Sequence, residues 1–247
     1  MVKIKKKEKR SIYQNIKNYL IDNKSFVIIS LLYAVLSISV IDWGIPNNQH
    51  PFTYHMDEWH QLQSVRATFK YLTPNIEGAA HGTIFHFVLS GIYLAPFYLL
   101  RIVDPFLIKS GLSEIAMQAK LFEILRLNTL MFGLLSLFIL NEITKKYFKI
   151  NPIFTLIFFA LTPLWINLSN YFKYDIALVF WILMAIFFIL KFGSRPSLRN
   201  YIYAGIACAL ALATKLSALP LFPIYFFSFF YFLPRNKRKY YHYVRHS

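Results

Sequence analysis

Long apolar runs alternate with short basic stretches along most of the chain. The apolar runs cover residues 25–41 and then about 83–100, 121–140, 150–168, 176–190, 201–214 and 216–233. A helix needs roughly 17–25 residues to cross the hydrocarbon core of a bilayer, so the last two runs are marginal. No strand-period alternation passes through these runs, which favours helices over a barrel. The pattern predicts an all-α fold, a polytopic bundle of transmembrane helices.

The composition agrees with this class. Of the 247 residues, 57% are hydrophobic and only 15% are charged, whereas soluble domains carry about 25% charged residues. The net charge of +16 could indicate nucleic-acid binding if the bases shared one exposed face. They lie instead in clusters between the apolar runs, at 3–10, 145–149, 191–199 and 235–245. We therefore expect membrane lipids as a partner and no nucleic acid.

The first apolar run, at 25–41, could be a signal peptide or a retained helix. Its polar lead of 24 residues is long, and Asp42-Trp43-Gly44-Ile45-Pro46 is a poor small-residue cleavage site. We interpret the run as a retained first span with its N-terminus inside.

The positions of the basic clusters decide between two topologies. If the run 83–100 crosses the membrane, two basic clusters lie outside, against the positive-inside rule. If it lies at the outer surface or is re-entrant, all four clusters become cytoplasmic. We therefore expect about six spans in a cell-membrane protein with both termini cytoplasmic. The expected parts are a basic N-terminus (1–24), a transmembrane module (25–233) with an external loop (44–120), and a basic tail (234–247).

The external loop is expected to contain two helices. Residues 58–72 have apolar side chains near three-to-four spacing, which predicts an interfacial amphipathic helix. The run 83–103 places Tyr93, Pro96, Tyr98 and Arg101 in its second half, which suits a half-inserted or membrane-surface helix.

Three carboxylates are expected on the outer side. Asp57 and Glu58 precede the amphipathic helix, and Asp175 stands at the outer start of the fourth span. Carboxylates at a membrane boundary act as general bases, metal ligands or substrate acceptors. Asp57 and Glu58 are equally compatible with solvated loop acids, and Asp175 with a first-turn acid favoured by the helix dipole.

Few cations share that side. They are Lys173, Lys215 and Arg126. Arg126 follows Glu123 by three residues, so an ion pair within the helix explains it without a substrate. Lys215 interrupts two apolar runs, which fits either a tight outer hairpin or a lipid phosphate contact.

Five of the seven histidines also lie on the outer side. The string from His55 to His60 has the ligand types for a metal but no recognised zinc spacing. A divalent metal is therefore possible but not indicated. No phosphate-binding glycine loop, G-x-S-x-G elbow or pair of cysteines is present.

Four segments in order resemble the GT-C glycosyltransferases, in particular protein O-mannosyltransferases and the aminoarabinose transferases that modify lipid A. The resemblance covers roughly 40–220. It rests on the external Asp-Glu pair, 126–135 (Arg-Leu-Asn-Thr-Leu-Met-Phe-Gly-Leu-Leu), Leu161-Thr162-Pro163-Leu164 followed by Tyr174-Asp175, and Ala204-Gly205 through Thr214-Lys215.

The resemblance implies a sugar transfer that inverts the anomeric carbon. The donor would be a sugar on a polyprenyl phosphate, and the acceptor a protein, glycan or lipid. Asp57 would be the general base, Glu58 would orient acceptor or sugar, and Asp175 would shape the same cavity. Lys215 would stabilise the leaving phosphate, together with Arg126 and Lys173. No cofactor is implied.

The chain departs from the family in two places. His81-Gly82-Thr83-Ile84 stands where many relatives have Lys/His-Pro-Pro-Leu, so His81 is only a positional candidate for phosphate contact. Relatives also have further spans, so we expect a partial enzyme. The alternatives are an inactive relative, or a non-enzymatic polytopic protein such as a transporter subunit or assembly factor.

Overall fold

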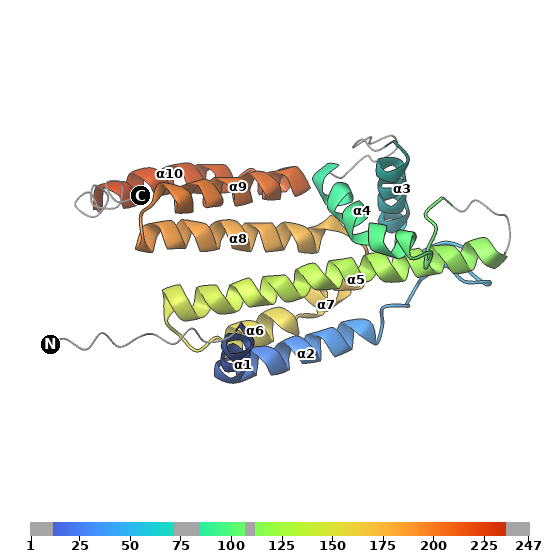
Figure 1. Ribbon diagram of the computed structural model, residues 1–247, viewed down its shortest axis with the longest axis horizontal. Helices are drawn as coiled ribbons and strands as arrows, with labels where there is room; N and C mark the ends of the chain where they lie inside the picture. The colour runs from blue at the N-terminus through green and yellow to red at the C-terminus, as the bar shows by residue number, and fades with distance from the viewer. Residues whose placement is uncertain (1–11, 72–83, 107–111, 236–247) are drawn as a thin grey trace.

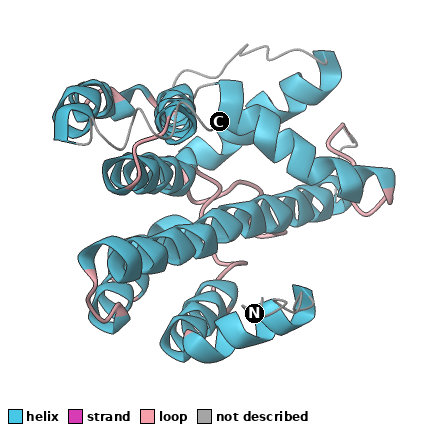
Figure 2. Cartoon of the chain, turned by 60° about the vertical axis from the view of Figure 1, so that its left-hand side comes forward, coloured by secondary structure: helices cyan, strands magenta, loops and turns pink. Residues whose placement is uncertain are grey.

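The structure is a computed structural model that describes residues 12–71, 84–106 and 112–235. The described part contains helices and loops without a strand (Figure 2). The helices are α1 (Ile12–Asp22), α2 (Lys24–Ile38), α3 (Met56–Tyr71), α4 (Ile84–Leu99), α5 (Leu112–Ile143), α6 (Ile153–Ala160), α7 (Pro163–Ser169), α8 (Tyr174–Ser194), α9 (Leu198–Thr214) and α10 (Leu221–Arg235). A π-helical turn, η1 (Thr144–Phe148), extends α5, and a short 3₁₀ turn, η2 (Leu216–Ala218), follows α9. The predicted all-helical class is confirmed.

The long helices stack in layers. Figure 1 shows α9 and α10 on one side of α8, then α5, and then α2 with α6 and α7. Helices α3 and α4 gather at the end of the bundle where α8 begins and α9 ends, and we call this the site end. Helix α1 lies at the opposite end and is seen nearly end-on, so it crosses the direction of the bundle.

Among the described residues, two helices are long and apolar enough to cross a membrane by length and composition, α5 with η1 (Glu114–Phe148) and α8 (Tyr174–Ser194). Shorter apolar helices cover Lys24–Ile38, Phe85–Leu99 and Leu216–Phe232. Large apolar side chains stay exposed on α2 and α10, as expected where lipid replaces water. They include Ile28, Leu31, Val35, Phe226, Phe227, Phe230 and Tyr231. The number of spans stays a prediction.

The helix bounds differ from the predicted ones in two places. The run 150–168 is not one continuous helix, because α6 ends at Ala160 and α7 begins at Pro163. Proline has no N–H for the helix ladder and disfavours helical backbone in the residue before it, so the helix is interrupted here. The run 121–140 lies inside the 32-residue α5, which is about 48 Å long at 1.5 Å per residue and exceeds the roughly 30 Å hydrocarbon core.

Helix α2 is an integral part of the bundle. Tyr33 of α2 is fully buried, and its hydroxyl lies 2.5 Å from Oγ of Ser169 on α7. This hydroxyl passes close to α5 at Gly133, where an added Cβ would lie 2.0 Å from it. Glycine is therefore required at this crossing. That the first apolar run is a retained span stays a prediction.

The predicted amphipathic helix is present as α3. It begins at Met56, two residues earlier than expected, and buries Leu62 and Val65 completely. Helix α4 corresponds to the predicted half-inserted helix and contains Pro96 in its second half. Together α3 and α4 pack on the part of α5 nearest the site end, with Phe122 and Leu125 of α5 at the centre of this cluster.

Candidate active site

Asp57 forms the first charged pair at the site end. It stands in the first turn of α3, and its carboxylate lies 2.8 Å from the ammonium of Lys173. The same ammonium lies 3.2 Å from Nε2 of His55, and the His55 ring packs against Tyr171. The Asp57 side chain is 50% exposed, whereas Lys173 is only 13% exposed. The Asp57 carboxylate is thus accessible to a ligand, while the Lys173 ammonium is mostly buried and contacts His55.

Asp175 and Lys215 form the second pair. The Lys215 ammonium donates a 2.7 Å hydrogen bond to Oδ1 of Asp175 and lies 4.9 Å from the centre of the Tyr174 ring. Asp175 stands in the first turn of α8, and Lys215 directly follows the last residue of α9. These two helices are antiparallel neighbours, so the start of one meets the end of the other. The fold therefore joins residues 40 positions apart in the sequence.

The two pairs belong to one electrostatic cluster. Lys173 and Asp175 are separated by a single residue, and Lys173 has the extended backbone that precedes α8. Partial burial lowers the pKa of Lys215, but the hydrogen bond and charge of Asp175, helped by the charge of Asp57, outweigh it and raise the pKa overall. We call Asp57, Lys173, Asp175 and Lys215 the charged cluster. It contains two carboxylates and two ammonium groups, and each ammonium is matched by one carboxylate.

Glu58 points away from this cluster into the protein. Both of its oxygens accept from Arg126, Oε1 from Nε at 2.9 Å and Oε2 from Nη2 at 2.7 Å. Neither side chain has any exposed surface. The Arg126 Nη1 group also donates to the backbone carbonyls of Ile41 and Trp43 at 2.6 and 2.7 Å. The expectation that Arg126 pairs with Glu123 is wrong, because the fold brings the more distant Glu58 to the guanidinium.

The Glu58–Arg126 pair supports the residues that carry the charged cluster. Oε1 of Glu58 also accepts a 2.7 Å hydrogen bond from the backbone N–H of Phe172, the neighbour of Lys173. One buried ion pair thereby connects the start of α3, the beginning of the segment after α2, the middle of α5 and the segment before α8. The substrate contacts predicted for Glu58 and Arg126 stay predictions, and in this conformation both groups are occupied by protein partners.

Some members of the site could not be assigned from the sequence. In the sequence, His55 is indicated only as part of a possible metal string, and no pattern indicates a function for Tyr171 or Tyr174. Their positions beside Lys173 and Lys215 depend on tertiary packing. The available signal was the polar stretch from Asn167 to Lys173, which separates two apolar runs and so indicates an exposed boundary.

The metal hypothesis finds no ligand set in the part of the chain that the structure describes. There, no three His, Cys, Asp or Glu side chains converge as metal ligands would. His81 lies outside the described residues, and its predicted phosphate contact stays a prediction.

The fold and site define the class as a helical membrane protein with charged groups gathered at one end of the bundle. Within that class, the sequence matches the family described as dolichyl-phosphate-mannose-protein mannosyltransferase over residues 103–245, and the chain belongs to this family. The matched segment includes Arg126, Lys173, Asp175 and Lys215, whereas Asp57 and Glu58 precede it. No curated protein and no solved structure gives a significant match. The chain is accordingly an integral membrane protein and a GT-C-type glycosyltransferase.

Proposed function

We propose that this protein transfers a sugar from a polyprenyl-phosphate donor to a hydroxyl or amine acceptor at the outer face of the cell membrane, with inversion at the anomeric carbon. The carrying observation is the charged cluster, in which Asp57 and Asp175 each pair with a lysine at the same end of the bundle. Membership in a family of lipid-linked mannosyltransferases supports the donor class.

The two lysines supply binding groups for the donor phosphate. Lys173 and Lys215 both hold an ammonium against a carboxylate, and both carboxylates remain partly exposed. A phosphate that enters between them would accept hydrogen bonds from the same ammonium groups, because such charge-assisted contacts are strong and short. The donor would thereby exchange partners with the protein and release the Asp57 carboxylate from Lys173.

The released Asp57 would then act as the base. The acceptor oxygen or nitrogen attacks the anomeric carbon while the bond from that carbon to the phosphate oxygen breaks. The electron pair of the broken bond stays on the departing phosphate, and the acceptor proton passes to the Asp57 carboxylate. Lys173 and Lys215 stabilise the charge that develops on the phosphate. Attack opposite the leaving group inverts the anomeric carbon in a single displacement.

Glu58 and Arg126 would position this chemistry without contacting the sugar. Asp57 and Glu58 are adjacent in one helical turn, so fixing the buried Glu58 also fixes the exposed carboxylate beside it. The hydrogen bond from Phe172 to Glu58 fixes the segment that carries Lys173. Base and phosphate-binding group are therefore held by the same buried carboxylate, and small displacements of such groups reduce rates strongly.

The donor class is tested with the purified full chain in vesicles and a membrane extract as the source of acceptors. We expect transfer of a radiolabelled sugar from a polyprenyl-phosphate donor and none from a nucleotide-linked donor of the same sugar. Transfer from the nucleotide-linked donor would refute the proposed donor. Absence of transfer from both donors would support the non-enzymatic or inactive alternatives.

A further inference from the structure

A second charged region lies at the end of the bundle opposite the charged cluster. It is a pocket of about 450 Å³ lined by Lys146, Tyr147, Phe187, Lys191, Ser194 and Arg195. We call it the basic pocket. Its residues come from the turn η1 after α5 and from the end of α8, so it opens between the two described helices that are long enough to span a membrane.

The length of α8 places the basic pocket at the other membrane face. Asp175 stands at the start of this 21-residue helix, and Lys191 and Arg195 stand at its end. Twenty-one residues extend about 32 Å at 1.5 Å per residue, close to the roughly 30 Å of a hydrocarbon core. When the charged cluster faces the outer surface, the basic pocket therefore lies at the level of the inner headgroups.

The lining is basic, and it contains no carboxylate. Lys146 pairs with Glu142 one turn earlier on α5. Lys191 holds its ammonium 5.5 Å from the centre of the Phe188 ring, and within the described residues neither it nor the Arg195 side chain has a hydrogen bond or ion pair to a protein acceptor. The backbone carbonyl of Arg195 accepts from Asn200 at 2.8 Å, which fixes the position of this residue. Two cations are thus available to an anion in a partly aromatic pocket.

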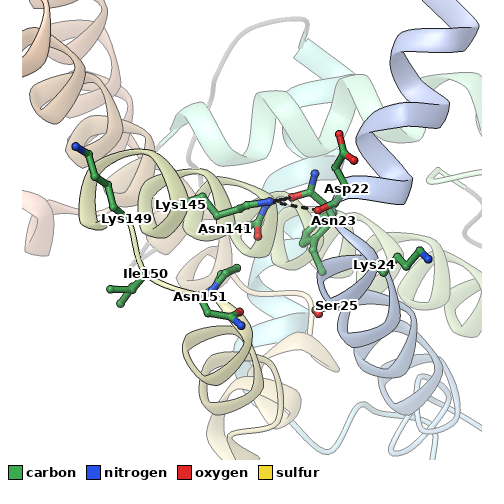
Figure 3. A pocket seen from close by; sticks show the side chains of 11 residues that line it. Asp22, Asn23, Lys24, Ser25, Asn141, Lys145, Lys149, Ile150 and Asn151 are labelled. Carbon is green, nitrogen blue, oxygen red and sulfur yellow. Dashed lines mark hydrogen bonds between the residues drawn. The ribbon is translucent and has the colours of Figure 1, made fainter.

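A neighbouring pocket of about 400 Å³ has a different character. Lys145, adjacent to Lys146, turns to the other side of η1 and donates a 2.8 Å hydrogen bond to Oδ1 of Asn23, which also accepts from Asn141 (Figure 3). Asp22 is among its lining residues. Its polar groups therefore bind α5 to the junction of α1 and α2. This second pocket contains Lys24 and Lys149, so the same number of positive charges can be removed from it as a control.

We propose that the basic pocket binds the headgroup phosphate of an anionic phospholipid from the inner leaflet. Lys191 and Arg195 would hold the phosphate, while Tyr147 and Phe187 contact the glycerol and the first part of the acyl chains. Basic pockets between transmembrane helices on the cytoplasmic side bind such headgroups. The proposal requires membrane insertion in the predicted orientation and is independent of the sugar-transfer chemistry.

The test uses the full chain purified in a neutral detergent and native mass spectrometry with added dioleoyl phosphatidylglycerol. The variant Lys191→Gln/Arg195→Gln is compared with the matched control Lys24→Gln/Lys149→Gln. At about fivefold in affinity for each cation near a headgroup, we expect binding to weaken about 25-fold in the first variant and to change little in the control. Phosphatidylcholine should not bind appreciably to the wild-type protein or to either variant.

Three results would overturn the proposal. The first is an unchanged affinity in Lys191→Gln/Arg195→Gln. The second is an equal loss in the control, which would show a general effect of charge rather than a pocket. The third is displacement of the lipid by millimolar inorganic phosphate, which would show that the pocket takes the free anion.

Discussion

Glu58 and Arg126 form a bidentate ion pair between residues 68 positions apart in the sequence, and neither side chain has exposed surface. The pair is complete, because Arg126 also donates to two backbone carbonyls and Glu58 accepts the backbone N–H of Phe172. Every charge at this buried point has a partner. The connection joins α3, α5 and the segment before α8 at the site end, and removing one of its charges leaves the other buried without a partner.

We predict that Glu58→Gln destabilises the protein strongly. Removing one partner of a buried ion pair leaves the other charge uncompensated, at a cost of about 3–5 kcal/mol. The measurement is thermal unfolding of the purified chain in detergent. Glu123→Gln is the matched control, because Glu123 lies on the same helix as Arg126 but is not its partner. Equal melting temperatures for Glu58→Gln and wild type would contradict the buried-pair assignment.

Lys215→Gln is predicted to weaken donor binding more than it lowers the maximal rate. The variant removes one proposed phosphate ligand and leaves Asp57 with Lys173. Because Asp175 raises the pKa of Lys215, the wild-type lysine stays charged throughout the neutral range, and no loss of donor affinity from this group is expected up to about pH 9. KM and kcat measured against pH test both statements. A normal KM with a reduced kcat would instead mean that Lys215 acts only in the transition state, and unchanged KM and kcat would place it outside the donor site.

Gly133→Ala is predicted to disturb the crossing of α2 and α5. The added Cβ would lie 2.0 Å from the Tyr33 hydroxyl, so one of the two helices must move. Overpacking of this kind costs about 1–3 kcal/mol. Adding Tyr33→Phe should recover part of the lost thermal stability, because it removes the closest atom. If the double variant loses as much stability as the two single variants together, no steric relief has occurred, and the steric explanation is wrong.

The orientation in the membrane is predicted from the charge pattern and can be measured with single cysteines. Asp57→Cys, Tyr147→Cys and Arg195→Cys are each introduced into a Cys208→Ala background and labelled in intact cells with an impermeant reagent. Asp57 belongs to the charged cluster and the other two to the basic pocket, so they lie at opposite ends of α8. We expect labelling at 57 alone, with all three labelled after permeabilisation. External labelling at 147 would invert the predicted topology.

The sequence was informative wherever the pattern is local. Apolar runs predicted helices in the described part of the chain, and the apolar spacing in 58–72 anticipated α3. The run 150–168 contains two helices and not one, because the helix-breaking effect of Pro163 outweighs the apolar composition of that run; whether the run crosses the membrane stays a prediction.

Long-range pairing was less predictable. The nearest carboxylate in sequence to Arg126 on its own helix is Glu123, and local spacing favoured that partner. Only the packing of the start of α3 near α5 shows that Glu58 pairs with the guanidinium of Arg126. The pairing of Asp175 with Lys215 also required the antiparallel contact of α8 and α9. The charged residue types and their predicted position on the outer side of the membrane indicated the site. Tertiary contacts decide which of these charged groups are exposed and which are buried.

The most direct test of the proposed reaction compares donor binding and sugar transfer in one preparation of Asp57→Asn. The substitution preserves size and removes the proposed base, while Asp42→Asn changes an exposed acid in the segment after α2 as a control. Loss of a general base lowers the rate by about 10²–10⁴-fold. We predict that Asp57→Asn binds the polyprenyl-phosphate donor normally and transfers sugar at least about a hundredfold more slowly, with Asp42→Asn like wild type. Undiminished transfer by a normally expressed Asp57→Asn would contradict the account.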